Sequence, residues 1–230
     1  MEKNIDKNLY IKNHNSFFDK IIIKNRSKML ALITNFLKDK DLFDVLDVGS
    51  TSDLSNESSN FLIKNLKNFK NYKSISDQKP QLTLFSKSLK KLITENLTDK
   101  ELDEYRSDLV ISNATIEHVG SFVNQVKMCE NIIKLSKKYF IIITPNRFHP
   151  IEFHSKLPLL HWLPKKIYRK ILFLLGMKFL SKEENLNLLS QSDLVKIMKN
   201  LNQSNYEIKN INFLLFKSNL LLIGNKIWLL

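Results

Sequence analysis

The sequence contains a single cysteine, Cys129, so the chain has no pair of thiols that could form an internal disulfide. A chain of this kind suits a reducing compartment, and this predicts a cytoplasmic protein. No apolar run approaches the length of about 18 residues that a membrane-spanning helix requires, and no secretory signal pattern opens the chain. With 43% hydrophobic residues among 230, the chain can still bury the core of one large domain. Cys129 shares helical spacing with Val126 and Ile133, which predicts a buried core thiol.

Arginine is scarce, since only four of the 36 basic residues are arginine. The formal net charge is nevertheless +13, and the lysines that produce it are spread along the whole chain. Proteins that read nucleic acid use arginine forks and gather their cations on one face. The abundant lysine and asparagine are instead typical of an AT-biased genome, so a nucleic-acid partner is disfavoured but stays an alternative.

Glycine is scarce as well, with four in the chain, and this bears on the stretch DVLDVGSTSD at residues 44–53. Here an apolar strand ends in Asp47-Val48-Gly49, as the first strand of a nucleotide-binding α/β domain does. Dinucleotide-binding turns carry two further glycines, which let the backbone approach a pyrophosphate and the helix pack on the strand. Thr51 and Asp53 stand at those positions and argue against NAD or FAD. A P-loop is excluded too, because no Gly-Lys-Ser/Thr follows.

Strand and helix patterns alternate along the rest of the chain. The expected strands are 43–48, 72–76, a weaker one at 91–94, 108–112, 139–144, 206–213, 219–223 and 226–229. The expected helices are 26–38, 57–67 after a Ser55-Asn56 cap, 121–136, 165–179 and 190–201. This order predicts an α/β Rossmann-like three-layer sandwich with a seven-stranded, mostly parallel sheet, an antiparallel C-terminal hairpin, and strands 108–112 and 139–144 adjacent inside it.

The chain is expected to form one domain over residues 1–230, without a linker or an internal repeat. Four prolines punctuate the segment that follows the 139–144 strand. We interpret residues 145–185 as an inserted cap at the carboxyl ends of the strands, where ligands of α/β sheets bind.

Three motifs, in the same order and spacing, resemble those of a known family. FDVLDVGS (residues 43–50) looks like the first motif of the class I S-adenosylmethionine-dependent methyltransferases. SDLVISNATIEHVGS (107–121) is very similar to the fourth-strand motif of their type 11 branch, and YFIIITPNR (139–147) resembles the fifth strand. The resemblance covers roughly residues 26–230. S-adenosyl-L-methionine carries no phosphate, so a single tight turn at Gly49 meets its requirement.

The resemblance implies an enzyme that transfers a methyl group from this donor to a small-molecule, sugar- or lipid-linked acceptor, at an oxygen atom. It places Asp47 and Gly49 at the methionine end of the donor, Asp53 near the donor's ammonium, and Asp77 at the ribose hydroxyls. The donor-binding residues that it implies are Asp47, Gly49, Ser50, Asp53, Asp77, Glu95, Asn113 and Ala114. The alternatives are a nucleic-acid methyltransferase and an inactive binding protein that kept the methyltransferase fold.

Methyl transfer from a sulfonium requires a positioned nucleophile and, for a hydroxyl acceptor, a group that removes its proton. His118, His149 and His154 are the candidate general bases, and each has a structural hydrogen-bonding role as its alternative. Glu152 lies between His149 and His154 in sequence, so either histidine could have a carboxylate partner. His161, beside Trp162, is expected to pack.

Glu117 and His118 are similar to a metal-binding pattern in the quinone-biosynthesis O-methyltransferases of this branch. Those proteins carry another glutamate three residues before the Glu-His pair, where this chain has Ala114. We therefore expect no metal.

Residues 165–179, from Lys165 to Phe179, read as a basic, apolar helix near a tryptophan. Such a helix can be a lid over the active site, or it can lie on the inner face of an anionic membrane.

Overall fold

The structure is a computed structural model that describes residues 16–54, 56–213 and 215–226. Its strands form one seven-stranded sheet in the order β3-β2-β1-β4-β5-β7-β6. The first five strands pair in parallel, whereas β7 runs antiparallel to both β5 and β6. The strands are β1 (Asp44–Val48), β2 (Asn71–Ser76), β3 (Lys87–Lys90), β4 (Ser107–Asn113), β5 (Ser136–Pro145), β6 (Tyr206–Phe213) and β7 (Phe216–Asn225). The predicted sheet is confirmed, with β4 and β5 adjacent inside it.

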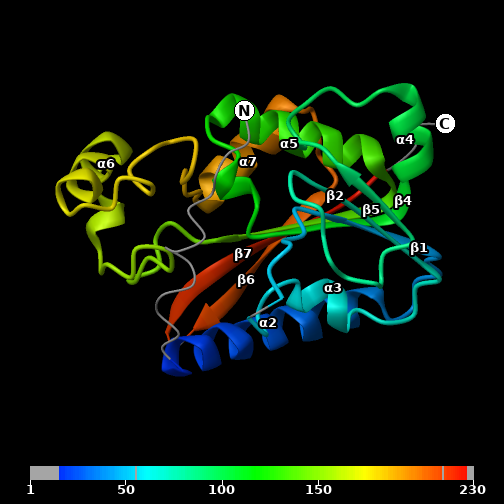
Figure 1. Cartoon of the computed structure of the whole chain (residues 1–230), viewed down its shortest axis with the longest axis horizontal. Helices are drawn as coiled ribbons and strands as arrows, with labels where there is room; N and C mark the ends of the chain where they lie inside the picture. The colour runs from blue at the N-terminus through cyan, green and yellow to red at the C-terminus, as the bar shows by residue number, and fades with distance from the viewer. Residues whose placement is uncertain (1–15, 55, 214, 227–230) are drawn as a thin grey trace.

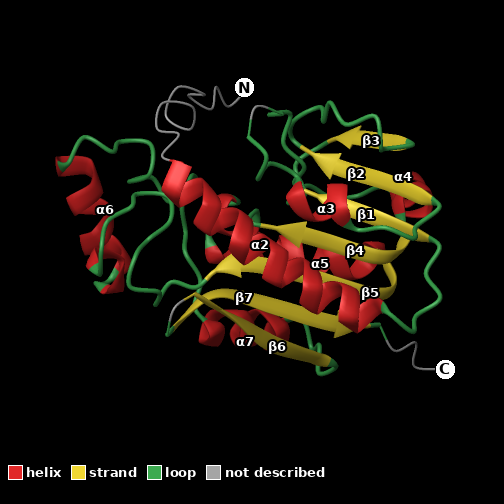
Figure 2. Ribbon diagram, turned by 90° about the horizontal axis from the view of Figure 1, so that it is seen from below, coloured by secondary structure: helices red, strands yellow, loops and turns green. Residues whose placement is uncertain are grey.

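Helices cover both faces of this sheet and complete the three layers (Figure 1). The helices are α2 (Ser16–Leu37), α3 (Phe61–Asn65), α4 (Asp99–Tyr105), α5 (Phe122–Leu135), α6 (Lys165–Leu174) and α7 (Gln191–Asn200). α2 and α3 lie on one face, α4, α5 and α7 lie on the other, and α6 stands apart from both layers (Figure 2). The predicted Rossmann-like α/β fold is therefore confirmed.

Successive strand residues point to opposite faces, so alternate residues of each strand feed two separate cores. Leu46, Val110 and Ile142 pack with Met128 and Cys129 of α5 in one cluster. The other cluster joins the α2 and α3 layer to the intervening strand residues, among them Val45, Leu109, Ile111, Ile141 and Ile143. Cys129 is completely buried, as predicted for a core thiol. Strands buried on both faces explain the nearly continuous apolar runs in the sequence.

Several helix boundaries differ from the predicted ones. α2 begins at Ser16 rather than at residue 26, because half-buried isoleucines at residues 21–23 extend its apolar face. α3 begins only at Phe61, after Asn60 with a φ of 54°. The Asn60 side chain donates to Thr51 O at 2.9 Å and accepts from Thr51 N at 3.0 Å, so it fixes the preceding loop instead. Ser55 of the predicted cap lies outside the described residues.

Two elements between β2 and β4 were predicted incorrectly. β3 occupies Lys87–Lys90 rather than 91–94, and its residues are largely exposed, so no hydrophobic pattern marks this edge strand. α4 was not predicted, although its start is visible in the sequence. Thr98 accepts from Glu101 N and Glu101 accepts from Thr98 N, which is a capping box. Residues 227–229 of the last predicted strand, 226–229, lie outside the described part of the chain.

Between β5 and α7 the chain forms a lobe, which we call the cap. Asn146 and Leu189 close its base through a parallel bridge. Figure 2 shows the cap beyond the carboxyl ends of the parallel strands. α6 within it ends at Leu174 instead of residue 179, since Gly176 adopts a φ of +79° shortly afterwards. A small apolar core holds the cap together: Tyr168, Leu172, Leu186 and Leu188. Among the described residues, no helix has the length and apolar character to cross a membrane.

Candidate functional site

The carboxyl ends of β1, β2 and β4 lie side by side at one edge of the sheet, because β1 pairs with both other strands. Gly49 follows β1 with a φ of +95°, a conformation that favours glycine. A β-carbon at Gly49 would overlap the Thr115 side chain, which lies on the turn after β4. Only a glycine therefore lets the two turns approach each other this closely.

Asp47 is buried within β1, and the Ser50 hydroxyl donates a hydrogen bond to its carboxylate. Burial raises the pKa of Asp47 to about 6, and the hydrogen bond from Ser50 only partly offsets this. Ser50 is itself buried, and its carbonyl accepts from the Ser76 hydroxyl at 2.6 Å. These contacts join the turn after β1 to the end of β2.

The loop that replaces the two missing glycines is held by side chains. Gln78 accepts hydrogen bonds from Ser52 N at 3.0 Å and from the hydroxyls of Thr51 and Ser52. Asp53 accepts from the Ser59 hydroxyl at 3.3 Å. The loop after β1 lacks the glycine pattern of a dinucleotide turn, and hydrogen bonds to Gln78, which follows β2, hold it in place.

The other acids proposed for donor binding lie on loops. Asp77 directly follows β2 and its side chain is exposed at the carboxyl edge of the sheet, next to the β1 turn. Glu95 follows β3 and is exposed, and its backbone carbonyl accepts from Asn131 of α5 at 2.8 Å. Asn113 ends β4 and Ala114 follows with a φ of 54°. Asp77, Asn113 and Ala114 therefore lie on strand ends next to the β1 turn, whereas Glu95 lies further out, after the edge strand.

The turn after β4 buries a carboxylate. Glu117 has no exposed surface, and its Oε2 accepts from the Thr144 hydroxyl of β5 at 2.9 Å. Its Oε1 is buried and has no hydrogen-bond partner. Arg26 of α2 interacts electrostatically with this carboxylate. Burial lowers the pKa of Arg26 to about 10, and the negative charge of Glu117 partly offsets that effect.

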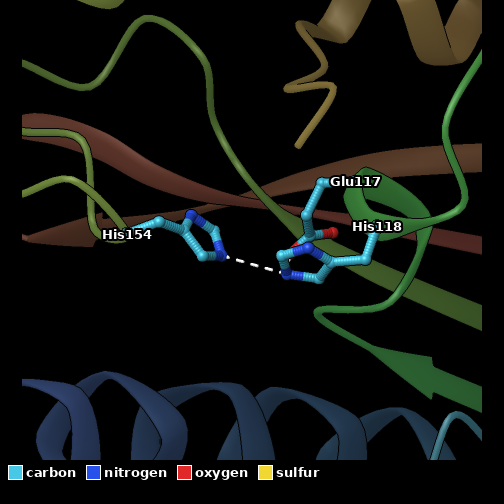
Figure 3. A group of neighbouring side chains, drawn as sticks. All are labelled: Glu117, His118 and His154. Carbon is cyan, nitrogen blue, oxygen red and sulfur yellow. Dashed lines mark hydrogen bonds and ion pairs between the residues drawn. The ribbon is translucent and has the colours of Figure 1, made fainter. Parts of the chain in front are cut away.

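His118 and His154 meet beside this carboxylate (Figure 3). His118 comes from the turn after β4 and His154 from the cap, and their Nε2 atoms lie 3.1 Å apart. The rings contact edge to face, with centroids 4.8 Å apart. Burial and the neighbouring His154 lower the pKa of His118, whereas the carboxylate of Glu152 raises the pKa of His154 against the effect of burial.

Glu152 anchors His154 and connects it to α6. Its Oε1 accepts from His154 Nδ1 at 2.6 Å and from His154 N at 2.9 Å, and its Oε2 accepts from the Tyr168 hydroxyl at 3.3 Å. Burial would raise the pKa of Glu152, but the charge and hydrogen bonds of His154 outweigh it and lower the pKa to about 2. Glu152 is thus the fixed carboxylate partner of His154.

The remaining histidines of the cap are placed differently. His149 is buried, its Nδ1 lies 2.8 Å from Ile151 O, and its ring stacks on Phe153. His161 is buried, with its Nε2 2.7 Å from His149 O. His161 therefore packs, as predicted. Of the three candidate bases, the structure brings together His118 and His154 and leaves His149 inside the cap.

Sequence reasoning missed the part that Tyr168 and Thr144 take in this site. Thr144 stands in an apolar segment, where a buried hydroxyl has to find a partner. Thr144 ends the apolar run of β5, and this position was the signal available in the sequence. Tyr168 gave no such signal, because its partner Glu152 lies on a different part of the cap.

No protein-family model matches the chain, and no curated protein is similar to it in sequence. Solved structures do share its fold. The N-methyltransferase NodS from Bradyrhizobium japonicum, in complex with S-adenosyl-L-homocysteine, is 10% identical, and the alignment has a TM-score of 0.55 and covers 96% of this chain and 95% of that chain.

Two further structures give the same result. Magnesium protoporphyrin IX methyltransferase from Synechocystis, with bound S-adenosyl-L-homocysteine, is 12% identical with a TM-score of 0.55, over 96% of this chain and 91% of that chain. The 1,6-didemethyltoxoflavin-N1-methyltransferase of Burkholderia thailandensis is 9% identical with a TM-score of 0.54, over 96% and 84%. This chain therefore has the fold of the class I S-adenosylmethionine-dependent methyltransferases.

Proposed function

We propose that the protein is an enzyme that transfers a methyl group from S-adenosyl-L-methionine to an oxygen atom of a small-molecule, sugar- or lipid-linked acceptor. The observation that carries this proposal is the carboxyl edge of the sheet. There the single tight turn at Gly49 lies between the exposed Asp77 and the Asn113–Ala114 turn. This is the position at which α/β sheets bind ligands.

The residues at this edge fit a donor without phosphate. In the proposed arrangement the methionine end lies at Asp47, Gly49 and Ser50, where the buried Asp47 and the nearby Asp53 offer negative charge to an ammonium. Asp77 accepts from the ribose hydroxyls, Glu95 lies toward the adenine, and Asn113 and Ala114 line the sulfonium. A bound donor would supply a methyl group on a sulfonium: an acceptor oxygen in line with the C–S bond would bond to the methyl carbon, and S-adenosyl-L-homocysteine would leave as a neutral thioether.

A hydroxyl acceptor has to lose a proton during the transfer, and His118 is our candidate for the base. Burial and the neighbouring His154 lower its pKa, so the imidazole is neutral near pH 7 and can accept a proton. The Asn185 carbonyl, 2.6 Å from His118 Nδ1, accepts a hydrogen bond from the protonated Nδ1. The proton-accepting lone pair is therefore on Nε2, the nitrogen that faces His154 Nε2 at 3.1 Å. His154, held by Glu152, then serves to orient the acceptor beside His118.

The surface of the cap supports an acceptor that is linked to lipid. Phe173, Leu174 and Leu175 at the end of α6 are 57%, 83% and 54% exposed. Lys166 and Lys170 are exposed on the same helix. Positive charge beside exposed apolar side chains is the pattern of a surface that lies on an anionic bilayer. We therefore extend the proposal to a cytoplasmic protein that contacts the inner face of the membrane through Lys165–Phe179.

Calorimetry with S-adenosyl-L-methionine and S-adenosyl-L-homocysteine tests the donor part of the proposal. We expect one donor per chain with a dissociation constant between about 1 µM and 1 mM, the range usual for enzyme substrates. Absence of heat at millimolar donor would contradict an enzyme and favour an inactive protein of this fold. Incubation with isotopically methyl-labelled donor and separate lipid, glycan and RNA fractions then identifies the acceptor class by the fraction that gains label.

A further inference from the structure

Three potential metal ligands from two separate parts of the fold converge beside the proposed donor site. Glu117 and His118 come from the turn after β4, and His154 comes from the cap (Figure 3). One ligand atom from each of the three lies within 4.8 Å of the others. Figure 3 shows the His154 ring directed at the His118 ring, with the Glu117 carboxylate beside the latter.

The hydrogen bonds of the two imidazoles determine which nitrogen of each ring is free. His118 Nδ1 lies 2.6 Å from Asn185 O, and a carbonyl can only accept, so Nδ1 carries the proton. His154 Nδ1 lies 2.6 Å from a carboxylate oxygen of Glu152, which is also an acceptor. When both rings are neutral, each presents an unprotonated Nε2, and these two lone pairs then face each other at 3.1 Å. Such a pair requires a cation between the nitrogens, either a proton or a metal ion.

The carboxylate of Glu117 supplies a second, independent indication. Its Oε1 is completely buried, has no hydrogen-bond partner, and lies 3.9 Å from His118 Nε2. Burying an ionised carboxylate is costly unless a cation or hydrogen-bond donors compensate it. Oε2 has the Thr144 hydroxyl as its partner and Arg26 contributes positive charge from α2, but Oε1 itself has no hydrogen-bond partner and lies near the imidazole pair.

We propose that Glu117, His118 and His154 bind one divalent transition-metal ion of the zinc type. Two imidazoles and one carboxylate form a set that holds zinc and leaves a fourth position open to water or a substrate. Imidazole ligands favour such ions over Mg²⁺ and Ca²⁺, which prefer all-oxygen sites. The outer partners are present as well, since Glu152 and Asn185 O accept from the non-ligating Nδ1 atoms, as carboxylates and carbonyls do at metal-bound histidines.

The distances agree with such an ion. With bonds of about 2.0–2.1 Å, two tetrahedral nitrogen ligands of zinc are separated by about 3.3 Å. The observed separation of the two Nε2 atoms is 3.1 Å. The Glu117 carboxylate would have to move toward the imidazoles by about 1 Å to complete the bond lengths of zinc.

This ligand set differs from the one on which the sequence-based expectation of no metal rested. That expectation followed from Ala114, which stands where related proteins have a glutamate. His154 of the cap supplies a third ligand that sequence spacing could not reveal. An ion at this position would connect the cap to the sheet and would take the place of the proton between the imidazoles. Metal binding and a role of His118 as a free base therefore exclude each other.

The test is a calorimetric titration of the full chain with Zn²⁺, and separately with Co²⁺ for its visible spectrum. The protein is purified without a polyhistidine tag and freed of metal by a chelator. We expect one ion per chain and the absorption bands of four-coordinate cobalt with nitrogen and oxygen ligands. Glu152→Gln should weaken Zn²⁺ binding by about 10- to 100-fold, the usual effect of removing an outer partner. His154→Gln and Glu117→Gln should weaken it more.

Two variants serve as matched controls. His149→Gln removes another buried histidine of the cap, and Glu184→Gln removes an exposed carboxylate near Asn185. Both should bind Zn²⁺ as the unmodified chain does. Thermal unfolding keeps the test valid if a variant is less stable, because Zn²⁺ should raise the melting temperature of the unmodified chain and not that of His154→Gln.

The proposal is overturned if millimolar Zn²⁺ gives no saturable binding, or if His154→Gln binds Zn²⁺ as tightly as the unmodified chain. It is also overturned if histidine nitrogen NMR shows one proton shared by the two Nε2 atoms after Zn²⁺ is added. None of these readouts uses a methyl donor or an acceptor. Failure of the metal proposal would therefore leave the proposed methyl transfer standing, and the converse also holds.

Discussion

The Nε2 atoms of His118 and His154 lie 3.1 Å apart, although the two residues are separated by 36 positions in the sequence. One ring stands on the turn after a central strand, and the other stands on the cap that follows β5. Glu152 and Tyr168 continue the chain of contacts from His154 to α6. The cap is therefore joined to the carboxyl edge of the sheet at the point where we place the chemistry.

Asp77 and Asp53 are both acids near the proposed donor, and their substitution separates their roles. Two charge-assisted hydrogen bonds to the ribose hydroxyls contribute about 2–4 kcal/mol, so Asp77→Ala should weaken donor binding by about 30- to 1000-fold. Asp53→Ala should weaken it less, because Asp53 is only half-buried and a solvent-screened pair with the ammonium contributes little. Calorimetry measures both. Unchanged donor affinity in a folded Asp77→Ala would show that the β2 end does not hold the ribose.

Gly49→Ala should destabilise the protein for two reasons that a double substitution separates. Alanine is strained at a φ of +95°, and its β-carbon overlaps the Thr115 side chain. Together these effects should lower the free energy of unfolding by about 2–4 kcal/mol. Adding Thr115→Ala should recover the part due to overlap but not the part due to φ. Urea denaturation of the single and double variants measures this, and full recovery in the double variant would contradict a backbone contribution.

Asp47 should make stability depend on pH. Burial raises its pKa to about 6, above the value in an unfolded chain. The folded state therefore holds the proton more tightly, and the contribution to stability is complete below about pH 4 and is lost as the pH rises through about 6. The loss amounts to about 3 kcal/mol at neutral pH.

Asp47→Asn removes this ionisation and should raise the free energy of unfolding at pH 7 while leaving it nearly unchanged at pH 4. Denaturation at both pH values measures the difference between the variant and the unmodified chain. If Asp47→Asn is less stable at pH 7, the carboxylate is ionised and compensated in the folded protein. Donor binding should weaken in the same variant, because the asparagine offers no charge to the ammonium.

Membrane contact through α6 should depend on its exposed aromatic residue. Phe173→Ser removes a large apolar group, so binding to vesicles that contain anionic lipid should weaken by about tenfold or more. Phe43→Ser is the matched control, because Phe43 is 50% exposed and precedes β1 at the opposite edge of the sheet. Co-sedimentation measures both. Equal loss in the two variants, or equal binding to vesicles of neutral lipid, would contradict a membrane surface on the cap.

The sequence by itself determined the class of fold and most of its elements. Periodicity is a local property, so the buried runs of β1, β4 and β5 and the apolar face of α5 could be located without knowledge of their partners. The order of these elements then restricted the topology, since parallel strands need crossovers of one hand. The position of β3 could not be predicted because an exposed edge strand has no apolar pattern. The start of α3 could not be predicted because the Asn60 side chain bonds to Thr51.

Only the tertiary structure decided how the site is assembled. In the sequence Glu152 lies between His149 and His154. In the folded protein it pairs with His154, whereas His149 points into the interior of the cap. The same fold brought His154 to His118 and left one oxygen of Glu117 without a partner. The path of the cap is set by contacts such as the bridge from Asn146 to Leu189, and contacts between distant residues leave no periodic trace in the sequence.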